Sequence, residues 1–415
     1  MDSPLTTDHS PLTMTVLIIT PNYTPAICGV GDHTAHLQRE LTATGNKVLL
    51  LTGTPGQDNI NSFSVAAFDG TMLPTLRKLI TKHQVDRILW QYVPYSYQTK
   101  GLPFWWPLLM LRLRQKGLKQ VIFFHEVSIR LWGYGVKRLV LAFLQRVIAN
   151  SAAIAANRTI TSIQLFRSYF VFNKPEIVPI SANVVSSNWS VVSGVRVSKK
   201  VSDAPIAIGR SVVNHEGASG VVSKTMRGDG VGGESTIFCF ANRADSALLE
   251  ALKNINRQVP VKLVLGGMIQ QAKKKELIAW ISEFDLETVI YFTGTVDAER
   301  LANYVASASV FIQPQIVERG NEGGVSAKNG TIMAAMSIGK AIVTCPGDMT
   351  DPRLFRDGEN MLLMPYGDAV GYEQALLALL TDKPLANELG EAAATTYQEY
   401  CSWEVTSKLI ETNLK

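Results

Sequence analysis

One stretch of the chain joins residue types that could hold a phosphate group. An apolar strand, SVFIQP, runs into a polar, glycine-rich loop that contains Gly323, Gly324 and Val325. A helix of small residues follows from about Gly330, and AIVTCPG then forms a second strand. A loop whose backbone is accessible at a helix N-terminus presents N–H groups to an anion. The pattern therefore predicts a β-loop-α-β unit with an anion site, beside which Lys328 could add positive charge.

A second glycine turn, Gly29-Val30-Gly31, follows the first apolar strand of the chain. Two glycines let the backbone approach an anion at the start of the next helix, where the helix dipole favours negative charge. The full dinucleotide-binding fingerprint is not present, because Thr34 stands at the position of its third glycine. The turn is therefore either a phosphate-binding loop or simply a tight turn.

Two side chains that follow apolar strands could contribute a hydrogen bond or a charge. His125 comes directly after VIFF, and ligand-contacting groups lie at the carboxyl ends of parallel strands. A lone histidine in this position can equally be a hydrogen-bonded structural residue. Arg243 follows STIFCFAN, and a cation there could neutralise a leaving diphosphate. His33 and His36 could share a helix face, but no third ligand is evident, so no metal site is predicted.

These residues fall between regularly alternating strands and helices. The alternation predicts an α/β fold with two doubly wound, Rossmann-like parallel sheets, in domains over 1–184 and 235–396. Residues 185–234 are rich in glycine and serine and predict a flexible connection, with an uncertain strand near 204–208. The final helix, about 397–415, could pack back on the first domain. Because ligands bind outside the strand C-termini, the sheets predict a cleft between the domains.

Both domains resemble the retaining glycosyltransferases of family 4 (glycosyl transferases group 1), which have the B-type two-Rossmann fold. The resemblance rests on PNYTPAICGVGDHTAHLQRELTATGNKVLLLTG, on the strand that ends in His125-Glu126, and on the glycine-rich loop. It implies an enzyme of saccharide biosynthesis that moves a hexose from a nucleoside diphosphate-sugar to a saccharide or lipid-linked acceptor, with retention of the anomeric configuration. It implies no metal and no other cofactor.

The resemblance also implies roles for individual residues. His125 would contact the donor sugar, and Arg243 would clamp the diphosphate, which the Gly29–Gly31 turn would face. The residues expected to hold the nucleotide base are Thr293, Gly294 and Val296. Those expected to bind the donor from the glycine-rich loop are Gly323, Gly324, Val325, Lys328 and Gly330.

The chain departs from the family where the family has two glutamates eight positions apart. Aligned on Gly339, it has Ser326 and Ala334 at these positions. Ser326, which we group with His125 as a catalytic residue, can still bond a sugar hydroxyl, and we expect the backbone amides of Gly324–Ser326 to remain available for phosphate. Glu322 is either a substitute that reaches the sugar or a loop charge. The lysine that completes the family's diphosphate clamp is also missing.

Two alternative functions follow from these departures. The chain could be a catalytically degenerate, glycosyltransferase-like binding or scaffold protein. It could also be a sugar-nucleotide epimerase on the same fold, which would turn over its substrate without an acceptor.

The composition limits which cellular compartment and which binding partners we expect. The hydrophobic fraction of 46% and charged fraction of 18% are typical of a folded protein, and a net charge of +5 gives no reason to expect nucleic acid. With four scattered cysteines and no secretory signal, we predict a cytoplasmic location. Segments 102–120 and 136–150 are apolar and basic, which suits peripheral contact with the inner face of a membrane. They could instead cover the first sheet, with their basic residues in water.

Overall fold

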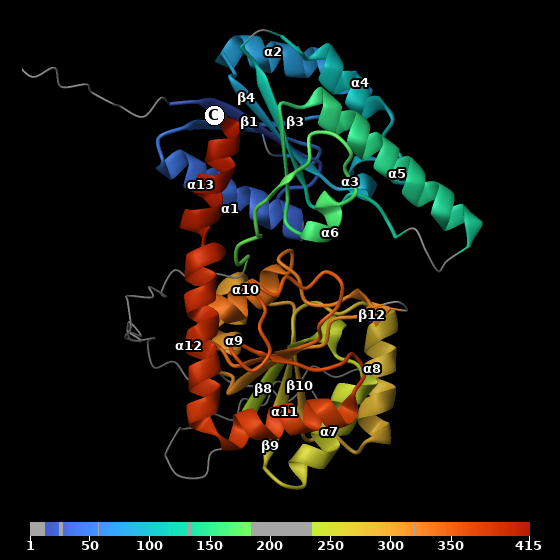
Figure 1. Ribbon diagram of the computed structural model, residues 1–415, viewed down its shortest axis with the longest axis vertical. Coiled ribbons are helices and arrows are strands. Elements are labelled where there is room, and N and C mark those ends of the chain that lie inside the picture. Colours follow the sequence, from blue (N-terminus) through green and yellow to red (C-terminus); the bar gives the residue numbers. More distant parts are fainter. Residues whose placement is uncertain are drawn as a thin grey trace, which may run out of the picture. The chain divides into compact units, whose positions relative to one another are not determined.

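The structure, a computed structural model, describes residues 13–24, 28–56, 58–115, 117–130, 135–183, 235–318 and 321–415. It divides into two compact units, each built on its own parallel sheet (Figure 1). The first unit comprises Met1–Asn183 and Trp403–Lys415, and the second Val184–Ser402. The two predicted doubly wound sheets are confirmed. The predicted connection, with its uncertain strand, lies outside the described residues, and the cleft stays a prediction.

The first unit has a seven-stranded parallel sheet in the order β3-β2-β1-β4-β5-β6-β7. Its strands are β1 (Thr15–Thr20), β2 (Lys47–Thr52), β3 (Ser62–Ser64), β4 (Arg87–Tyr92), β5 (Lys119–Phe124), β6 (Arg158–Thr161) and β7 (Glu176–Ile177). Its helices are α1 (Gly29–Ala43), the 3-10 turn η1 (Gly70–Met72), α2 (Leu73–His83), α3 (Pro94–Tyr97), α4 (Trp105–Arg112), α5 (Val136–Ala155), α6 (Gln164–Arg167) and α13 (Trp403–Leu414).

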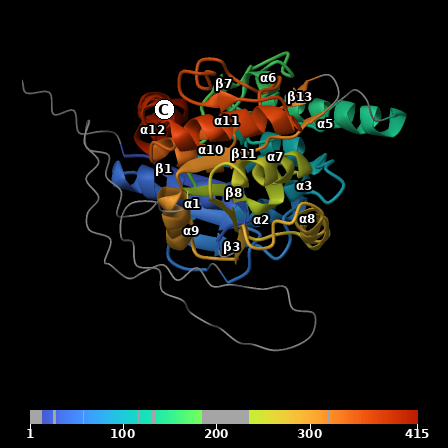
Figure 2. The ribbon, with the colours of Figure 1, turned by 90° about the horizontal axis from the view of Figure 1, so that it is seen from below.

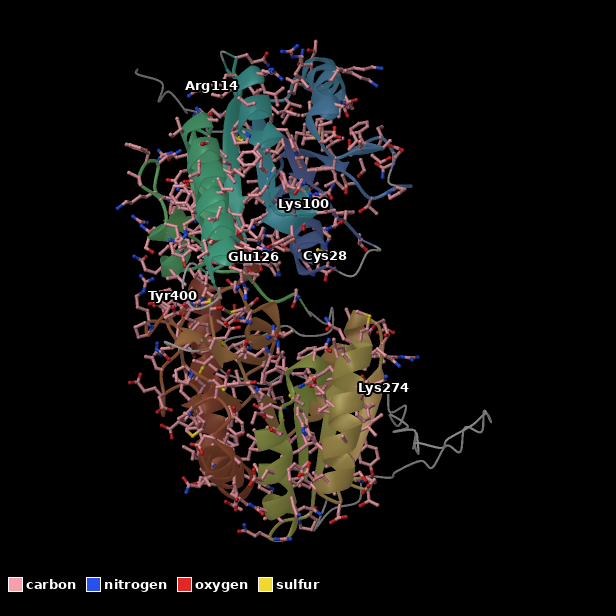
Figure 3. The ribbon with its side chains drawn as sticks, turned by 90° about the vertical axis from the view of Figure 1, so that its right-hand side faces the viewer. Cys28, Lys100, Arg114, Glu126, Lys274 and Tyr400 are labelled. Carbon is pink, nitrogen blue, oxygen red and sulfur yellow. The ribbon has the colours of Figure 1, made fainter. Side chains whose placement is uncertain are left out.

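Helices cover both faces of this sheet, so its central strands β1 and β4 are buried at every position but the first and are mostly apolar. Val16 and Ile18 of β1 pack in one core cluster with Leu37 of α1 and Ile410 of α13. On the other face, the ring of Tyr92 stacks on Trp106 of α4 with centroids 4.2 Å apart. Successive strand residues point to opposite faces, and two covered faces therefore require a continuous apolar run. Figure 3 looks at the side of this unit that carries α4 and α5.

The C-terminal segment is two helices and not the single one that the sequence predicts. The helix α12 (Lys383–Tyr400) ends in the second unit, and α13 starts at Trp403 in the first, with Cys401 and Ser402 between them. Polar contacts fix α13: Trp403 Nε1 donates to the carbonyl of Ala182 at 2.8 Å. The hydroxyls of Ser181 and Thr406 lie 2.6 Å apart in a buried position. The last residues of the chain therefore complete the first unit.

The second unit has a six-stranded parallel sheet in the order β10-β9-β8-β11-β14-β15 and a short antiparallel pair, β12-β13. Its strands are β8 (Ser235–Phe240), β9 (Val261–Gly266), β10 (Ile290–Gly294), β11 (Val310–Gln313), β12 (Val317–Glu318), β13 (Glu322–Gly323), β14 (Ile342–Thr344) and β15 (Leu362–Leu363). The remaining helices are η2 (Ala241–Arg243), α7 (Ser246–Asn256), α8 (Gln271–Glu283), α9 (Ala298–Ser307), α10 (Gly330–Ser337) and α11 (Ala369–Thr381).

The helices α7 and α11 lie side by side on one face of the second sheet (Figures 1 and 2). Leu248 of α7 and Leu376 of α11 belong to the same core cluster as Ile237 of β8. Phe238 is the next residue of β8, and it faces the other way and stacks on Phe311 of β11, with ring centroids 5.9 Å apart. This sheet too is apolar on both faces, as a doubly wound fold requires.

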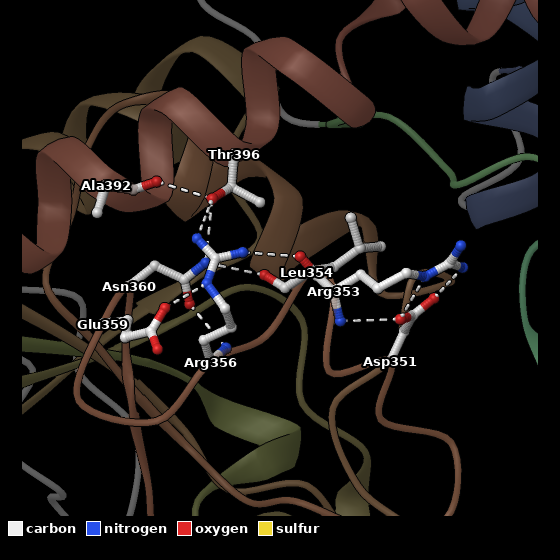
Figure 4. A network of polar contacts seen from close by, with 8 residues as sticks. All are labelled: Asp351, Arg353, Leu354, Arg356, Glu359, Asn360, Ala392 and Thr396. Carbon is white, nitrogen blue, oxygen red and sulfur yellow. Dashed lines mark hydrogen bonds and ion pairs between the residues drawn. The ribbon is translucent and has the colours of Figure 1, made fainter.

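A polar network ties the loop before β15 to α12 (Figure 4). Its centre is Asn360, which is fully buried. The Asn360 side chain donates to the carbonyl of Leu354 at 2.9 Å and to Thr396 Oγ1 at 3.1 Å, and it accepts from the N–H of Arg356 at 2.9 Å. Ion pairs from Arg356 to Glu359 and from Arg353 to Asp351 lie at the rim. One buried amide thus holds a loop that has little secondary structure of its own.

Candidate functional site

The strand orders place one candidate site in each unit. In the first sheet the order reverses between β1 and β4, and in the second between β8 and β11. Ligands of open α/β sheets bind outside the carboxyl ends of the strands at such a switch point. The chain leaves these strand ends through the loop before α1 in the first unit, and through η2 and the loop before α10 in the second.

The glycine turn of the first unit forms the N-terminus of α1. Gly31 is tightly packed, because a Cβ atom there would lie 3.2 Å from the Tyr23 Cα atom. Gly29 is exposed, and no described atom lies within 4 Å of the place its Cβ would take. Cys28 precedes the helix in an extended conformation without a side-chain cap. The first N–H groups of α1, those of Gly29 and Val30 included, therefore lack intrahelical partners and form an arrangement that can hold an anion.

His125 lies at the end of β5, buried against the sheet. Its Nε2 atom is 2.6 Å from Gln91 Oε1. A carboxamide oxygen only accepts, so in this pairing Nε2 carries the hydrogen. The ring stacks on Phe123 at 4.4 Å, and burial together with His33 holds the pKa of His125 well below its usual range. His125 is thus a neutral imidazole whose Nδ1 can accept a hydrogen bond, and its contact with a sugar stays a prediction.

His33 and His36 form an aromatic cluster with α13, an arrangement the sequence did not predict. The ring of His33 lies 5.1 Å from that of His125 and 5.2 Å from Trp403, and His36 stacks on Trp403 at 5.1 Å. Burial lowers the pKa of His33 to about 3, and burial with nearby Arg39 lowers that of His36 to about 4. No group of three His, Cys, Asp or Glu side chains suited to a metal occurs among the described residues.

Arg243 lies in η2, directly after β8, and its side chain is exposed. The turn is held in place by its neighbour Asn242, which donates to the carbonyl of Met268 at 2.9 Å and accepts from the N–H of Gln270 at 3.1 Å. Asp245 follows this turn. It accepts from the N–H of Leu248 at 2.8 Å as the N-cap of α7, and burial raises the pKa of its carboxyl. Arg243 therefore remains available to an anionic ligand.

The segment expected to hold a nucleotide base ends β10. Thr293 Oγ1 accepts from the N–H of Gly267 at 3.1 Å and donates to the carbonyl of Gly294 at 2.9 Å. Gly294 has a φ of 64°, and Val296 is half-buried before the N-cap of α9. The Thr293 hydroxyl thus already shapes the strand end, and base contacts by these three residues stay a prediction.

The glycines of the loop before α10 are required by a close approach of two backbones. Gly323 and Gly324 have φ values of 128° and 84°. A Cβ atom on Gly324 would lie 2.3 Å from the backbone nitrogen of Gly347, and one on Gly323 would lie 2.1 Å from the carbonyl oxygen of Ile316. Residues with a Cβ cannot meet either condition. Gly323 and Gly324, which stand out in the sequence, are therefore explained by close packing of this backbone, in part against the loop after β14.

This packing overturns the expectation that the amides of Gly324–Ser326 are available for phosphate. All three already donate to the protein: Gly324 to the carbonyl of Ile316 at 3.2 Å, Val325 to the carbonyl of Cys345 at 2.8 Å, and Ser326 to Asn329 Oδ1 at 3.0 Å. The N–H of Gly323 also donates, to Asp348 Oδ1 at 3.0 Å. The backbone N–H groups of this loop from Gly323 to Ser326 therefore already have partners within the protein.

Asn329, a residue not singled out in the sequence, organises the start of α10. The fully buried Ser326 hydroxyl donates to Asn329 Oδ1 at 2.7 Å, and Asn329 Nδ2 donates to Gln315 Oε1 at 3.5 Å. Because the Asn329 side chain turns back in this way, α10 has no side-chain cap. The amides of its first turn, beginning with Gly330, are left without intrahelical partners. Lys328 is half-buried directly before this turn.

The two family glutamates have no functional counterpart among these side chains. Ala334 lies inside α10 and is 4% exposed, while the Ser326 hydroxyl is bonded to Asn329. A catalytic contact of Ser326 with a sugar stays a prediction. The groups of the second unit that could bind an anion are instead the first-turn amides of α10 and Arg243, which follow neighbouring strands at the same sheet edge.

Comparison with known proteins identifies a family whose model matches part of this chain. Residues 239–382 match the model of the family described as glycosyl transferases group 1. This match lies within the second unit. An uncharacterized glycosyltransferase of Methanocaldococcus jannaschii is 28% identical over 161 residues, which is 39% of this chain and 39% of that protein.

Solved structures extend the likeness in fold to both units. Sucrose-phosphate synthase from Thermosynechococcus elongatus has a TM-score of 0.66 at 16% identity, over 96% of this chain and 98% of that one. HepE of Anabaena, in complex with UDP-glucose, has a TM-score of 0.60 at 15% identity, over 96% and 99%. The chain thus has the B-type glycosyltransferase fold, and its match to the group 1 family model lies in its second half.

Proposed function

We propose that the protein is a glycosyltransferase that moves a hexose from a nucleoside diphosphate-sugar to a hydroxyl of a saccharide or lipid-linked acceptor, with retention. The second unit would bind the nucleotide-sugar. Its match to the glycosyltransferase family, and the structural likeness to a protein solved with UDP-glucose, support this assignment.

The observation that carries the proposal is the open N-terminus of α10 beside the switch point of the second sheet. The Asn329 side chain leaves the first-turn amides of α10 uncapped, and the helix dipole favours negative charge there. Exposed Arg243 follows β8, the strand next to β11, which leads to α10. A diphosphate needs both donors and cations, and the departing diphosphate is the group whose charge must be stabilised in the transfer.

Isothermal calorimetry of the full chain with UDP, GDP and ADP tests the donor site. We expect one nucleoside diphosphate to bind more tightly than millimolar. Arg243→Ala should weaken this binding about tenfold or more, since a charge-assisted bond is lost. Arg257→Ala is the matched control, because Arg257 is also exposed but ends α7 at the far side of the unit. Equal affinities of the two variants, or no binding by the wild type, would contradict the proposal.

A catalytically degenerate binding protein is the second candidate. It is favoured by Ala334 and by the bonded state of Ser326, since neither supplies the carboxylate that the family uses at these positions. Such a protein would bind the nucleotide-sugar and form no glycoside with any acceptor. Product analysis separates the candidates, and turnover of the nucleotide-sugar without an acceptor would indicate an epimerase instead.

A further inference from the structure

The outer faces of α4 and α5 expose large apolar side chains. In Figures 1 and 3 the two helices lie side by side on the first unit, and they pack against each other. The exposed apolar residues of this surface, with exposed fractions from 41% to 75%, are Phe104, Leu108, Leu111, Val136, Val140, Phe143, Val147 and Ile154. We call this set the α4–α5 surface. A helix that only covers a sheet turns its polar face to water, so this surface is not explained by the fold of the unit.

The spacing of these residues makes a continuous stripe along each helix. On α5 the exposed apolar positions recur at intervals of four and three from Val136 through Val140 and Phe143 to Val147, and Ile154 continues the same side. On α4, Phe104, Leu108 and Leu111 follow the same intervals. The opposite sides of both helices are buried. On α4, for example, Trp106 and Met110 are buried. Both helices are therefore apolar on the inner and on the outer side.

The tip of a neighbouring loop extends this surface. Val171 and Phe172 are 71% and 63% exposed. Asn150 of α5 holds their loop, since it accepts from the N–H of Val171 and donates to the carbonyl of Tyr169, both at 3.0 Å. A rigidly held loop with two exposed apolar side chains adds to the area that water would otherwise have to solvate.

The charges around the α4–α5 surface are almost all positive. From residue 99 to residue 157 the sequence contains one acidic residue, Glu126, and nine basic ones, which are Lys100, Arg112, Arg114, Lys116, Lys119, Arg130, Lys137, Arg138 and Arg146. Exposed cations lie at both ends of the stripe. Arg112 and Arg114 end α4, while Lys137 and Arg138 begin α5. The two helices run in the same direction, because each returns from the carboxyl end of a strand to the next parallel strand.

We propose that the α4–α5 surface binds an anionic lipid membrane. Apolar side chains between flanking cations match the boundary between acyl chains and anionic headgroups, in which the helices would lie flat. A soluble protein partner or a second copy of the chain would not require cations at both ends of the stripe with one carboxylate in the whole region. The proposal does not depend on the proposed transfer reaction, and it would place a lipid-linked acceptor beside the enzyme.

The mode of contact is along the surface and not across the bilayer. By length and composition α5 alone could span a membrane, the only such helix in the described part of the chain, and 39% of its most apolar window is buried against the unit. Its buried side carries Gln145, which accepts from the N–H of Ile129 at 2.8 Å. Withdrawal of α5 into a bilayer would break this packing, whereas contact through Val140 and Phe143 leaves it intact.

Vesicle sedimentation of the full chain without nucleotide tests the proposal. We expect the protein to pellet with vesicles of phosphatidylcholine and phosphatidylglycerol and much less with phosphatidylcholine alone. The double substitution Val140→Ser/Phe143→Ser should lower the partition coefficient about tenfold or more, since apolar area is lost. Arg114→Gln/Lys137→Gln should lower it about twenty-five-fold, at roughly fivefold for each cation near the surface. Ile60→Ser is the matched control, since Ile60 is 85% exposed in the same unit but outside the surface.

Three outcomes would overturn the inference. The first is a wild type that does not pellet with anionic vesicles. The second is binding that the charge substitutions and added salt leave unchanged. The third is a stable dimer, seen by light scattering without vesicles, that Val140→Ser/Phe143→Ser dissociates. The variants should keep the wild-type melting temperature, since only exposed side chains change, and nucleotide binding should be unaffected, which keeps this test separate from that of the proposed function.

Discussion

Three neutral histidines are the residues through which pH acts most directly on the first unit. His33 and His125 are almost fully buried, and His36 is half-buried against Trp403. Their pKa values in the fold lie below the usual value near 6.5, at about 3 for His33 and about 4 for His36. Each imidazole is held in its neutral form because desolvation penalises the charged form.

We expect the free energy of unfolding of the first unit to fall as the pH falls below about 6.5. The unfolded chain takes up protons on these histidines near that pH, whereas the folded unit does so only near pH 3 to 4 or below. The loss should approach roughly 1.4 kcal/mol per pH unit for each fully buried histidine. Urea unfolding followed by tryptophan fluorescence at about pH 7 and about pH 5 measures it.

His33→Phe is the matched variant for this prediction, because it keeps the aromatic contacts with Phe123 and Trp403 and removes one titrating group. Its stability should depend less steeply on pH than that of the wild type. An unchanged slope would show that His33 does not carry the effect.

Single residues also mark where sequence reasoning was right and where it failed. The glycines at 323 and 324 were recognised as special, but the reason is the approach of Gly347 and Ile316, which no local pattern reveals. Gln91 and Asn329 were missed, and His33 was considered only as a metal ligand, because their roles depend on partners brought close only by folding. Arg243 at the end of a strand could be predicted, since strand ends at a switch point are defined by the strand pattern itself.

At the scale of elements, the loop between β14 and β15 depends on one amide. Asn360→Leu removes three hydrogen bonds and leaves the N–H of Arg356 and the carbonyl of Leu354 without this partner. We expect a loss of about 2–4 kcal/mol in the stability of the second unit, from the penalty for buried unpaired polar groups. Thermal unfolding followed by circular dichroism gives the measurement.

Glu359→Gln is the control for Asn360→Leu. It breaks the ion pair of Arg356 with Glu359, whose side chain is 67% exposed. Exposed ion pairs contribute about 1 kcal/mol or less, so this variant should melt close to the wild type. A larger loss from Glu359→Gln than from Asn360→Leu would assign the network's stability to its rim.

The apolar strands SVFIQP, AIVTCPG, VIFF and STIFCFAN were predicted to within a few residues of the ends of β11, β14, β5 and β8, because a strand covered on both faces is a continuous apolar run. The short strands β3, β6 and β15 were not predicted. The residues of β6, Arg158–Thr161, read as RTIT and carry only one strongly apolar side chain. Such strands form because a neighbouring strand offers free backbone groups. Their own residues do not reveal this, so they cannot be predicted from the local sequence.

For the whole molecule, the return of α13 to the first unit predicts an effect of shortening the chain. A protein that ends at Ser402 lacks Ile410, which is fully buried in the first core, and the Trp403 contacts with His33 and His36. We expect the first unit to lose cooperative unfolding while the second keeps its own transition, because the second retains all of α12. Hydrogen exchange measured by mass spectrometry resolves the two units.

Thr406→Val is a milder test of the same dependence. It leaves the buried hydroxyl of Ser181 without its partner and should cost about 1–2 kcal/mol in the first unit alone. If the amides of the first unit exchange as slowly in the shortened chain as in the full chain, α13 contributes nothing to the stability of that unit.

The crossing at Cys401 and Ser402 also sets an order of events during synthesis. Domains usually fold as they emerge, N-terminal first, at about 5–20 residues per second. Here residues up to Asn183 leave the ribosome long before Trp403 exists. The face of α1 that α13 covers then stays bare for roughly 10–50 s while the second unit is made. The second unit can therefore finish before the first, and in that interval the nascent chain presents an apolar surface to chaperones that the finished protein hides.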